Sequence, residues 1–246
     1  MADASQVVKE MAAEAEQGRT PPALERFLKE RFGKPEQGLL SRWLSGPQTF
    51  EVRRIELFQD GGFFRRSCVF WVYAKGLLLE GSVLPAGGSF GVFSLGPDGA
   101  LRSLNRRQDE VEALLQGEGR PLDECAPGVL ASLIAEALGR QRNDSHAVLE
   151  SAEHLARYDG GMRGAGGGYE VDARELERAR PSISAPAISG NAGTGWWLEF
   201  CTVFGWMHEK RTLLRHRCRF SPDFRLHLEQ EVLSRAIFSQ TPGVIY

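Results

Sequence analysis

Cysteine is scarce in this sequence, and no two cysteines lie close enough to form a redox or zinc motif. The four cysteines are Cys68, Cys125, Cys201 and Cys218. Without a CxxC pair, neither a disulfide framework nor a thiol redox site is indicated, so we expect a protein of the reducing cytoplasm. His216 and Cys218 could share one strand face, but two ligands do not make a zinc site, and no metal is expected.

The sequence also lacks a long apolar run and an excess of charge of either sign. No apolar stretch approaches the roughly 20 residues that a membrane helix needs. Residues 1–5 lack the basic and apolar segments of a signal peptide. The 30 lysines and arginines against 32 aspartates and glutamates leave a formal net charge of −2. Such a balance predicts neither nucleic acid nor a membrane as a partner.

Motifs for nucleotide binding and nucleophilic catalysis are missing as well. Residues 190–195 have the composition of a phosphate-binding loop, but the run at 196–200 that follows them is typical of a strand. A phosphate loop needs a helix there, because the helix N-terminus holds the phosphate. A Gly-x-Ser-x-Gly elbow is absent too. We therefore expect no cofactor.

The order of the periodic patterns predicts an α+β protein. The segments are N-terminal helices in 1–46, a first strand meander in 49–104, a helical insertion in 105–158, a loop rich in glycine, proline and serine in 159–195, and C-terminal strands in 196–246. Because strands occur in both halves of the chain, we expect a single domain, 1–246. Its one antiparallel sheet would be built from both halves, with helices on one face.

Individual helices and strands follow from the spacing of apolar residues. Alternation predicts strands at 50–58, 64–73, 77–84, 90–93, 196–206, 212–220 and 225–238. Helical spacing predicts helices near 7–12, 21–32, 39–44, 111–115 and 129–138. Another helix is expected after a cap at Asp144 or Ser145, with Val148, Leu149, Ala152 and Leu155 facing inward. The irregular loop is expected to contain one charged helical fragment at 172–180.

Three arginines at alternate positions are the most distinctive cluster of charge. Arg215, Arg217 and Arg219 share one face of a predicted strand. Acidic residues that could lie across from them are Glu209, Glu229 and Glu231. In one interpretation the two sets neutralise each other on a solvated sheet face. In the other, the guanidinium groups form a pocket for a carboxylate or phosphate, lined by the aromatic residues that crowd the strands.

Two hairpins of this sequence resemble the central and final hairpins of the chorismate lyase-like family, which includes chorismate lyases and effector-binding domains of bacterial repressors. The matching residues are 66–85, with Arg66 on the first strand and Pro85 ending the second; then Leu95, Gly96, Ala100 and Leu104; and finally 215–233. Ser234 stands where the family usually has proline. The first 45 residues lack a basic recognition helix, so a DNA-binding regulator is not expected.

The resemblance implies a role for one residue in each hairpin. In the family, the strand arginine binds the substrate carboxylate, and a glutamate lies near the leaving enolpyruvyl group. The resemblance assigns these roles to Arg66 and Glu231, which would converge on one cavity, and it implies no metal or cofactor. Arg217 and Arg219 are the further candidates for ligand binding.

Two functions therefore stay open. The first is binding of a small aromatic or carboxylate ligand, with a lyase of chorismate-lyase type as its enzymatic form. The alternative is a non-enzymatic partner-binding or assembly protein, in which arginines and glutamates satisfy one another and aromatic residues form an exposed patch. The sequence does not decide whether the chain is an enzyme, nor its oligomeric state.

Overall fold

The structure is a computed structural model that describes residues 3–32, 51–75, 89–138, 145–157, 169–205, 212–235 and 237–240. Backbone contacts divide the chain into two compact units, Met1–Gly119 and Arg120–Tyr246. Both units combine helices with antiparallel sheets, which confirms the predicted α+β class. Each unit has its own buried apolar cluster.

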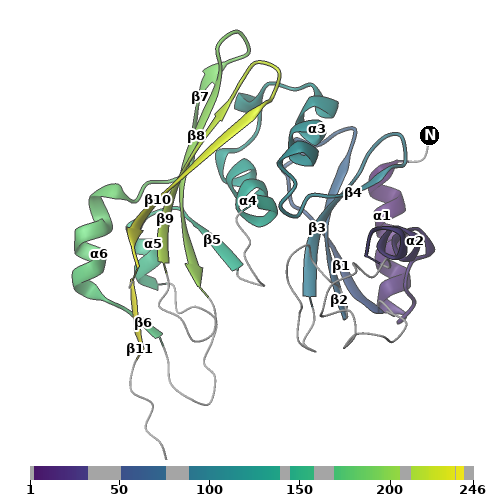
Figure 1. The fold of residues 1–246 in the computed structure, drawn as a ribbon, viewed down its shortest axis with the longest axis horizontal. Coiled ribbons are helices and arrows are strands. Elements are labelled where there is room, and N and C mark those ends of the chain that lie inside the picture. Colours follow the sequence, from purple (N-terminus) through teal and green to yellow (C-terminus); the bar gives the residue numbers. More distant parts are fainter. Residues whose placement is uncertain are drawn as a thin grey trace, which may run out of the picture. The chain divides into compact units, whose positions relative to one another are not determined.

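The first unit is an antiparallel meander with two N-terminal helices packed against it (Figure 1). Its elements are α1 (Ala4–Glu16), α2 (Pro22–Phe32), β1 (Glu51–Leu57), β2 (Cys68–Lys75), β3 (Ser89–Leu95), β4 (Leu101–Ser103) and α3 (Gln108–Glu118). The strand order is β1-β2-β3-β4. Val8 of α1 and Leu28 of α2 share one buried cluster with Phe70 and Phe93 of the sheet. The predicted helix at 39–44 and strand at 77–84 lie outside the described residues.

The second unit is built on a larger antiparallel sheet. Its elements are a 3-10 turn η1 (Leu122–Glu124), α4 (Pro127–Leu138), β5 (Ser145–Leu149), α5 (Ala152–Arg157), β6 (Tyr169–Val171), α6 (Ala173–Ala179), η2 (Arg180–Ser182), β7 (Ala187–Asn191), β8 (Gly195–Gly205), β9 (Thr212–Phe220), β10 (Leu226–Ser234) and β11 (Phe238–Gln240). The strand order is β10-β9-β8-β5, with β7 also paired to β8. A separate two-stranded pair joins β11 to β6.

The face of this sheet that carries the arginines is covered at only one end. There, Cys201, Val203 and Leu213 are buried in a cluster with residues of α5 and α6. Further along β9 the burial alternates, so that His216, Cys218 and Phe220 are buried on the opposite face while Arg217 and Arg219 are exposed. On this face, the row of arginines at 215, 217 and 219 therefore starts next to the apolar cluster that α5 and α6 form with the sheet.

The strands form two larger sheets and a two-stranded pair where the sequence suggested one sheet. Within the described ranges, β1 to β4 pair only among themselves, β8 to β10 form a sheet with β5 and β7, and β11 pairs with β6. Pairing between strands that are near in sequence closes shorter loops and costs less entropy, which favours two local sheets over one shared sheet. The assignment of 1–246 to a single domain stays a prediction.

Much of the segment predicted as an irregular loop, 159–195, is regular structure. The predicted helix at 172–180 is confirmed as α6, and the Asp172 carboxylate caps it by accepting bonds from the backbone N–H groups of Arg174 and Glu175. The strand β7 was not predicted, because its glycine and serine give no apolar alternation. Its pairing with β8 uses main-chain groups, which these small residues supply as well as any other.

The helix predicted after residue 145 is partly wrong. Residues 145–149 form β5, which pairs with residues 201–205 of β8, and only 152–157 are helical. Leu149 and Leu155 are both buried as expected, but from two different elements. The apolar spacing of residues 148–155 also fits the inward side of a helix, and the partner strand decides the outcome.

None of the helices in the described ranges is long and apolar enough to cross a membrane. Those same residues hold no group of three or more histidines, cysteines, aspartates or glutamates that could bind a metal ion.

Candidate functional site

The three arginines of β9 lie in the middle of three cross-strand rows, which we call the arginine ladder. The register of β8, β9 and β10 forms the rows Trp197–Arg219–His227, Glu199–Arg217–Glu229 and Cys201–Arg215–Glu231. Side chains directly opposite each other on one face are near neighbours, so each arginine meets the residues of its row. The predicted shared face of Arg215, Arg217 and Arg219 is confirmed.

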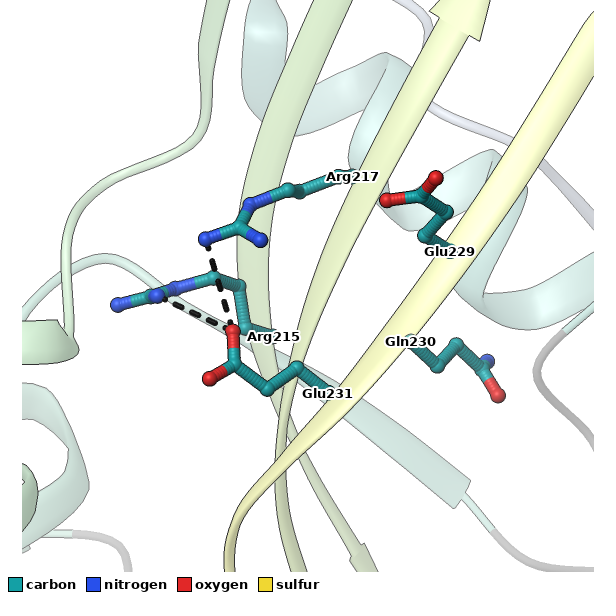
Figure 2. A pocket seen from close by; sticks show the side chains of 5 residues that line it. All are labelled: Arg215, Arg217, Glu229, Gln230 and Glu231. Atoms are coloured by element: carbon teal, nitrogen blue, oxygen red, sulfur yellow. Dashed lines mark hydrogen bonds and ion pairs between the residues drawn. The ribbon is translucent and has the colours of Figure 1, made fainter.

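Two arginines of the ladder are neutralised by two carboxylates. The Nη1 atom of Arg215 lies 3.2 Å from Oε2 of Glu231, and Nη2 of Arg217 lies 3.5 Å from the same oxygen. Glu199 lies 3.2 Å from Nε of Arg217 and 3.7 Å from Nε of Arg215. Figure 2 shows Arg215, Arg217 and Glu231 turned toward one another. The geometry therefore favours mutual neutralisation over three free guanidinium groups.

Arg215 is the most enclosed member of the ladder. Its side chain is 16% exposed, whereas that of Arg217 is 44% exposed. Its Nη2 atom donates a 3.0 Å hydrogen bond to the carbonyl oxygen of Ser182, which follows α6. Its Nε atom is buried and has no hydrogen-bond partner, because Glu199 stands too far away for a hydrogen bond.

The far end of the ladder is aromatic and positively charged. Trp197 is 51% exposed, and the guanidinium carbon of Arg219 lies 5.3 Å from the centre of its ring. This distance permits a cation–π interaction. In the part of the chain that the structure describes, Arg219 forms no ion pair with a carboxylate. Trp197 and Arg219 thus offer an exposed aromatic ring and a cation to the solvent.

A shallow recess of about 250 Å³ lies beside the ladder, lined by Arg215, Arg217, Glu229, Gln230 and Glu231. Its lining is almost entirely charged. Figure 2 shows the Gln230 side chain pointing away from the arginines. On that opposite face, Nε2 of Gln230 lies 3.4 Å from Nδ1 of His216. Of the predicted site residues, Arg217 and Glu231 meet at this recess, and Arg219 lies further along the strand.

Arg66 lies in the first unit and has a local structural role. It precedes β2 instead of belonging to the strand, which corrects the predicted strand at 64–73. The buried carboxylate of Glu118 accepts bonds of 2.7–3.2 Å from the backbone N–H groups of Arg65, Arg66 and Ser67. The Arg66 guanidinium donates to the carbonyl oxygen of Gly117 at 3.2 Å. Together these bonds fasten this bend to the C-terminal end of α3.

The candidate metal ligands and the glycine loop are explained by the fold. His216 is buried, stacks on Phe200 with ring centres 4.6 Å apart, and hydrogen-bonds Thr202 at 2.7 Å. Burial raises the pKa of the Cys218 thiol to about 12, so it stays protonated at neutral pH. Residues 191–194 form the turn between β7 and β8. A strand therefore follows the glycine-rich segment, as the sequence predicted, and not the helix that a phosphate-binding loop needs.

Sequence reasoning missed three of the residues that shape these arrangements. The alternation along β8 places Glu199 and Trp197 on one face of the strand. Which residues of β9 lie opposite them depends on the β8–β9 register, which the sequence does not give. Glu118 was missed because it resembles any other acidic residue at the end of a helix. The ligand-binding roles of Arg66, Arg217 and Arg219 and the catalytic role of Glu231 stay predictions.

Comparisons with protein-family models, with curated proteins and with solved structures find no match to this chain.

Proposed function

We propose that this chain is a non-enzymatic protein that binds another protein through the exposed part of the arginine ladder. The observation that carries the proposal is the exposed Trp197 with Arg219 beside its ring. Tryptophan and arginine are the residues that most often dominate binding energy at protein interfaces. A carboxylate of the partner would bind Arg219, and an apolar side chain would cover Trp197.

The ion pairs of the ladder support this proposal over a small-molecule site. Arg215 and Arg217 already contact Glu199 and Glu231, so a ligand carboxylate would have to displace a protein carboxylate to reach them. The recess of about 250 Å³ is smaller than typical ligand pockets of roughly 300–1,000 Å³. Those pockets are mostly apolar, whereas charged residues line this one.

A small carboxylate ligand is the second candidate, favoured by one observation. The buried Nε atom of Arg215 lacks a hydrogen-bond partner beside the recess, and a ligand oxygen could accept from it. If the resemblance to the chorismate lyase-like family extends to function, the ligand would be an aromatic carboxylate with Glu231 near its reacting group.

A comparison of variants tests the protein-binding proposal. The purified full chain is used to capture proteins from extracts of the cells that produce it, and each captured protein is then purified and titrated by calorimetry. We expect Trp197→Ala and Arg219→Ala each to weaken the affinity at least about tenfold. Arg225→Ala, an exposed arginine in the turn before β10, is the matched control and should change the affinity less than about twofold.

Two results would contradict the proposal. One is a purified partner whose affinity is unchanged in both Trp197→Ala and Arg219→Ala. The other is a thermal-shift screen of aromatic carboxylates, chorismate included, in which a ligand stabilises the wild type but not Arg217→Ala. The second result would favour the small-molecule candidate instead.

A further inference from the structure

The outer edge of β10 is a long strand edge that no described strand covers. β10 ends the strand order and pairs along its whole length with β9 on one side (Figure 1). The register is continuous from Leu226 to Val232, and a bulge follows before Ser234. An edge strand of an antiparallel sheet directs the N–H and C=O groups of alternate residues away from its neighbour. These groups can pair with a further strand.

The other side of the sheet does not offer an equivalent edge. The second edge of β8 is shared by β7, which pairs with residues 195–199, and β5, which pairs with 201–205. Both of these strands have only five residues, against nine in β10. In β7, Gly190 has a φ of +108°, which departs from regular strand geometry. β10 is therefore the longest regular edge in the described part of the second unit.

The two faces of β10 differ in chemistry. On the ladder face, Glu229 and Glu231 are exposed and lie two residues apart (Figure 2). On the other face, Leu228 is half-buried and Val232 is 43% exposed. A strand added at this edge would place alternate side chains opposite the two carboxylates. Its remaining side chains would lie beside Leu228 and Val232.

Charge argues against a second copy of this chain as the added strand. The longest symmetric antiparallel pairing of two β10 strands has Gln230 at its centre. This pairing places Glu229 of one copy opposite Glu231 of the other, and like charges directly opposite each other are destabilising. A strand with lysine or arginine opposite Glu229 is complementary instead, because this exposed carboxylate is not paired with an arginine in the described residues.

We propose that the outer edge of β10 binds an extended segment of a partner protein as an added strand, with a basic residue opposite Glu229 and apolar residues on either side of it. The proposal rests on the proposed protein-binding function and names the chemistry of the partner segment. Main-chain hydrogen bonds would supply affinity, and Glu229 would select a basic side chain, because Glu231 is already paired with Arg215 and Arg217. The same carboxylates oppose pairing with apolar or acidic edges, which limits aggregation of the free protein.

Hydrogen exchange of the full chain, followed by NMR, tests the proposal with a defined probe. The probe is a capped nine-residue peptide that alternates lysine with valine and matches the nine residues of β10. We expect it to slow exchange of alternate backbone amides in 227–232 at least about tenfold. Its binding should weaken as NaCl rises from about 0.05 to about 0.3 M, because the carboxylates are exposed. A peptide that alternates glutamate with valine should give no protection.

Substitutions at Glu229 test whether this carboxylate is responsible for binding of the lysine peptide. Glu229→Gln should weaken the lysine peptide several-fold, and Glu229→Lys should abolish its binding and favour the glutamate peptide. The matched control is Glu177→Lys on α6, an exposed glutamate that pairs with Arg180 and should leave both peptides unaffected.

Three outcomes would overturn the proposal: equal binding of both peptides, no protection of the outward-facing amides of β10 by either, or outward-facing amides in 227–232 that are already protected in the free protein. Protection without any peptide would mean that another part of the chain or a second copy covers the edge. Analytical ultracentrifugation distinguishes these two cases, because only the second gives a dimer. If the peptide does not bind at β10, the proposed function can still be tested, because the loss of partner affinity in Trp197→Ala does not require an added strand.

Discussion

Arg215 and Glu231 lie directly opposite each other on β9 and β10, and their side chains form an ion pair at 3.2 Å. The two partners have different surroundings. The Arg215 side chain is mostly enclosed, whereas that of Glu231 is about half exposed. Arg217 shares the same carboxylate but stands in solvent. The Glu231 carboxylate therefore pairs with two arginines that differ strongly in burial. Burial determines how much each of these ion pairs contributes to stability.

Arg215→Ala should destabilise the second unit far more than Arg217→Ala. We expect a loss of about 2–4 kcal/mol for Arg215, because its side chain is mostly enclosed and its bond to the Ser182 carbonyl oxygen is partly buried. We expect less than about 1 kcal/mol for Arg217, since ion pairs between exposed groups contribute little. Urea denaturation of both variants measures the free energies of unfolding. Equal losses would show that the enclosure of Arg215 has no energetic consequence.

Glu118→Gln should destabilise the first unit. The carboxylate accepts bonds from three consecutive backbone N–H groups, and a glutamine side chain would turn its own N–H₂ donor toward some of them. We expect a loss of about 2–3 kcal/mol, the cost of leaving buried donors unpaired. Asp109→Asn is the matched control on the same helix, where an exposed carboxylate pairs with Arg107 and should matter by only a few tenths of a kcal/mol. Thermal unfolding measures the loss of stability in both variants. Similar losses would refute the proposal that the Glu118 carboxylate holds the three backbone N–H groups.

The sequence was sufficient to predict the arginine face and its acidic partners on β10, but not its partner Glu199 on β8. Alternation along 212–220 and the turn at Ser221 place Arg215 and Arg217 on one face, opposite Glu229 and Glu231. Both features are local. Glu199 reaches the same arginines from β8, and its register with β9 depends on the connection between the two strands. A one-residue change in that register would turn Glu199 to the other face, so local pattern alone could not identify it.

Arg66 illustrates a second limit. Its neighbours alternate like those of a strand, and this pattern predicted a strand that begins before it. Three consecutive N–H groups there bind Glu118 instead, a residue more than fifty positions away. A contact between residues so far apart leaves no periodic signal in the sequence. For the same reason the sequence did not predict the division into separate sheets, since strand pairing is decided by partners and not by the pattern of one strand.

The buried thiol of Cys218 should make the stability of the second unit fall as pH rises above about 9. Burial raises the pKa of this thiol to about 12, whereas a cysteine in the unfolded chain titrates near pH 8.5 (an approximate value). Between these pH values the unfolded state loses a proton that the native state keeps, so the free energy of unfolding decreases with pH by about 1.4 kcal/mol per unit. Below about pH 8 this dependence should vanish.

Cys218→Ala supplies the control for this pH dependence. The variant should be less stable than the wild type at pH 7, because buried atoms are lost, but its stability should fall less steeply between pH 9 and about 11. Urea denaturation at several pH values measures both slopes. Identical slopes in the two proteins would mean that Cys218 does not titrate differently in the folded and unfolded states.

Gly195→Ala should destabilise the β7–β8 hairpin and the sheet that it joins. Gly195 has a φ of +87°, and a Cβ atom there would overlap the carbonyl oxygen of Phe220 on the neighbouring strand. Neither group can move without disturbing the pairing of β8 with β9, where Trp196 lies opposite Phe220. We expect a loss of at least about 3 kcal/mol, from backbone strain and steric overlap together.

Gly128→Ala is the contrasting substitution in the same unit. Gly128 lies in α4 with open space around its missing Cβ, and alanine favours the helix, so the variant should be up to about 1 kcal/mol more stable. Urea denaturation should therefore shift the two variants in opposite directions. A tolerated alanine at 195 would argue against the close approach of this turn to β9. The interpretation of 191–194 as a hairpin turn, which argues against a phosphate loop there, would then lose its structural basis.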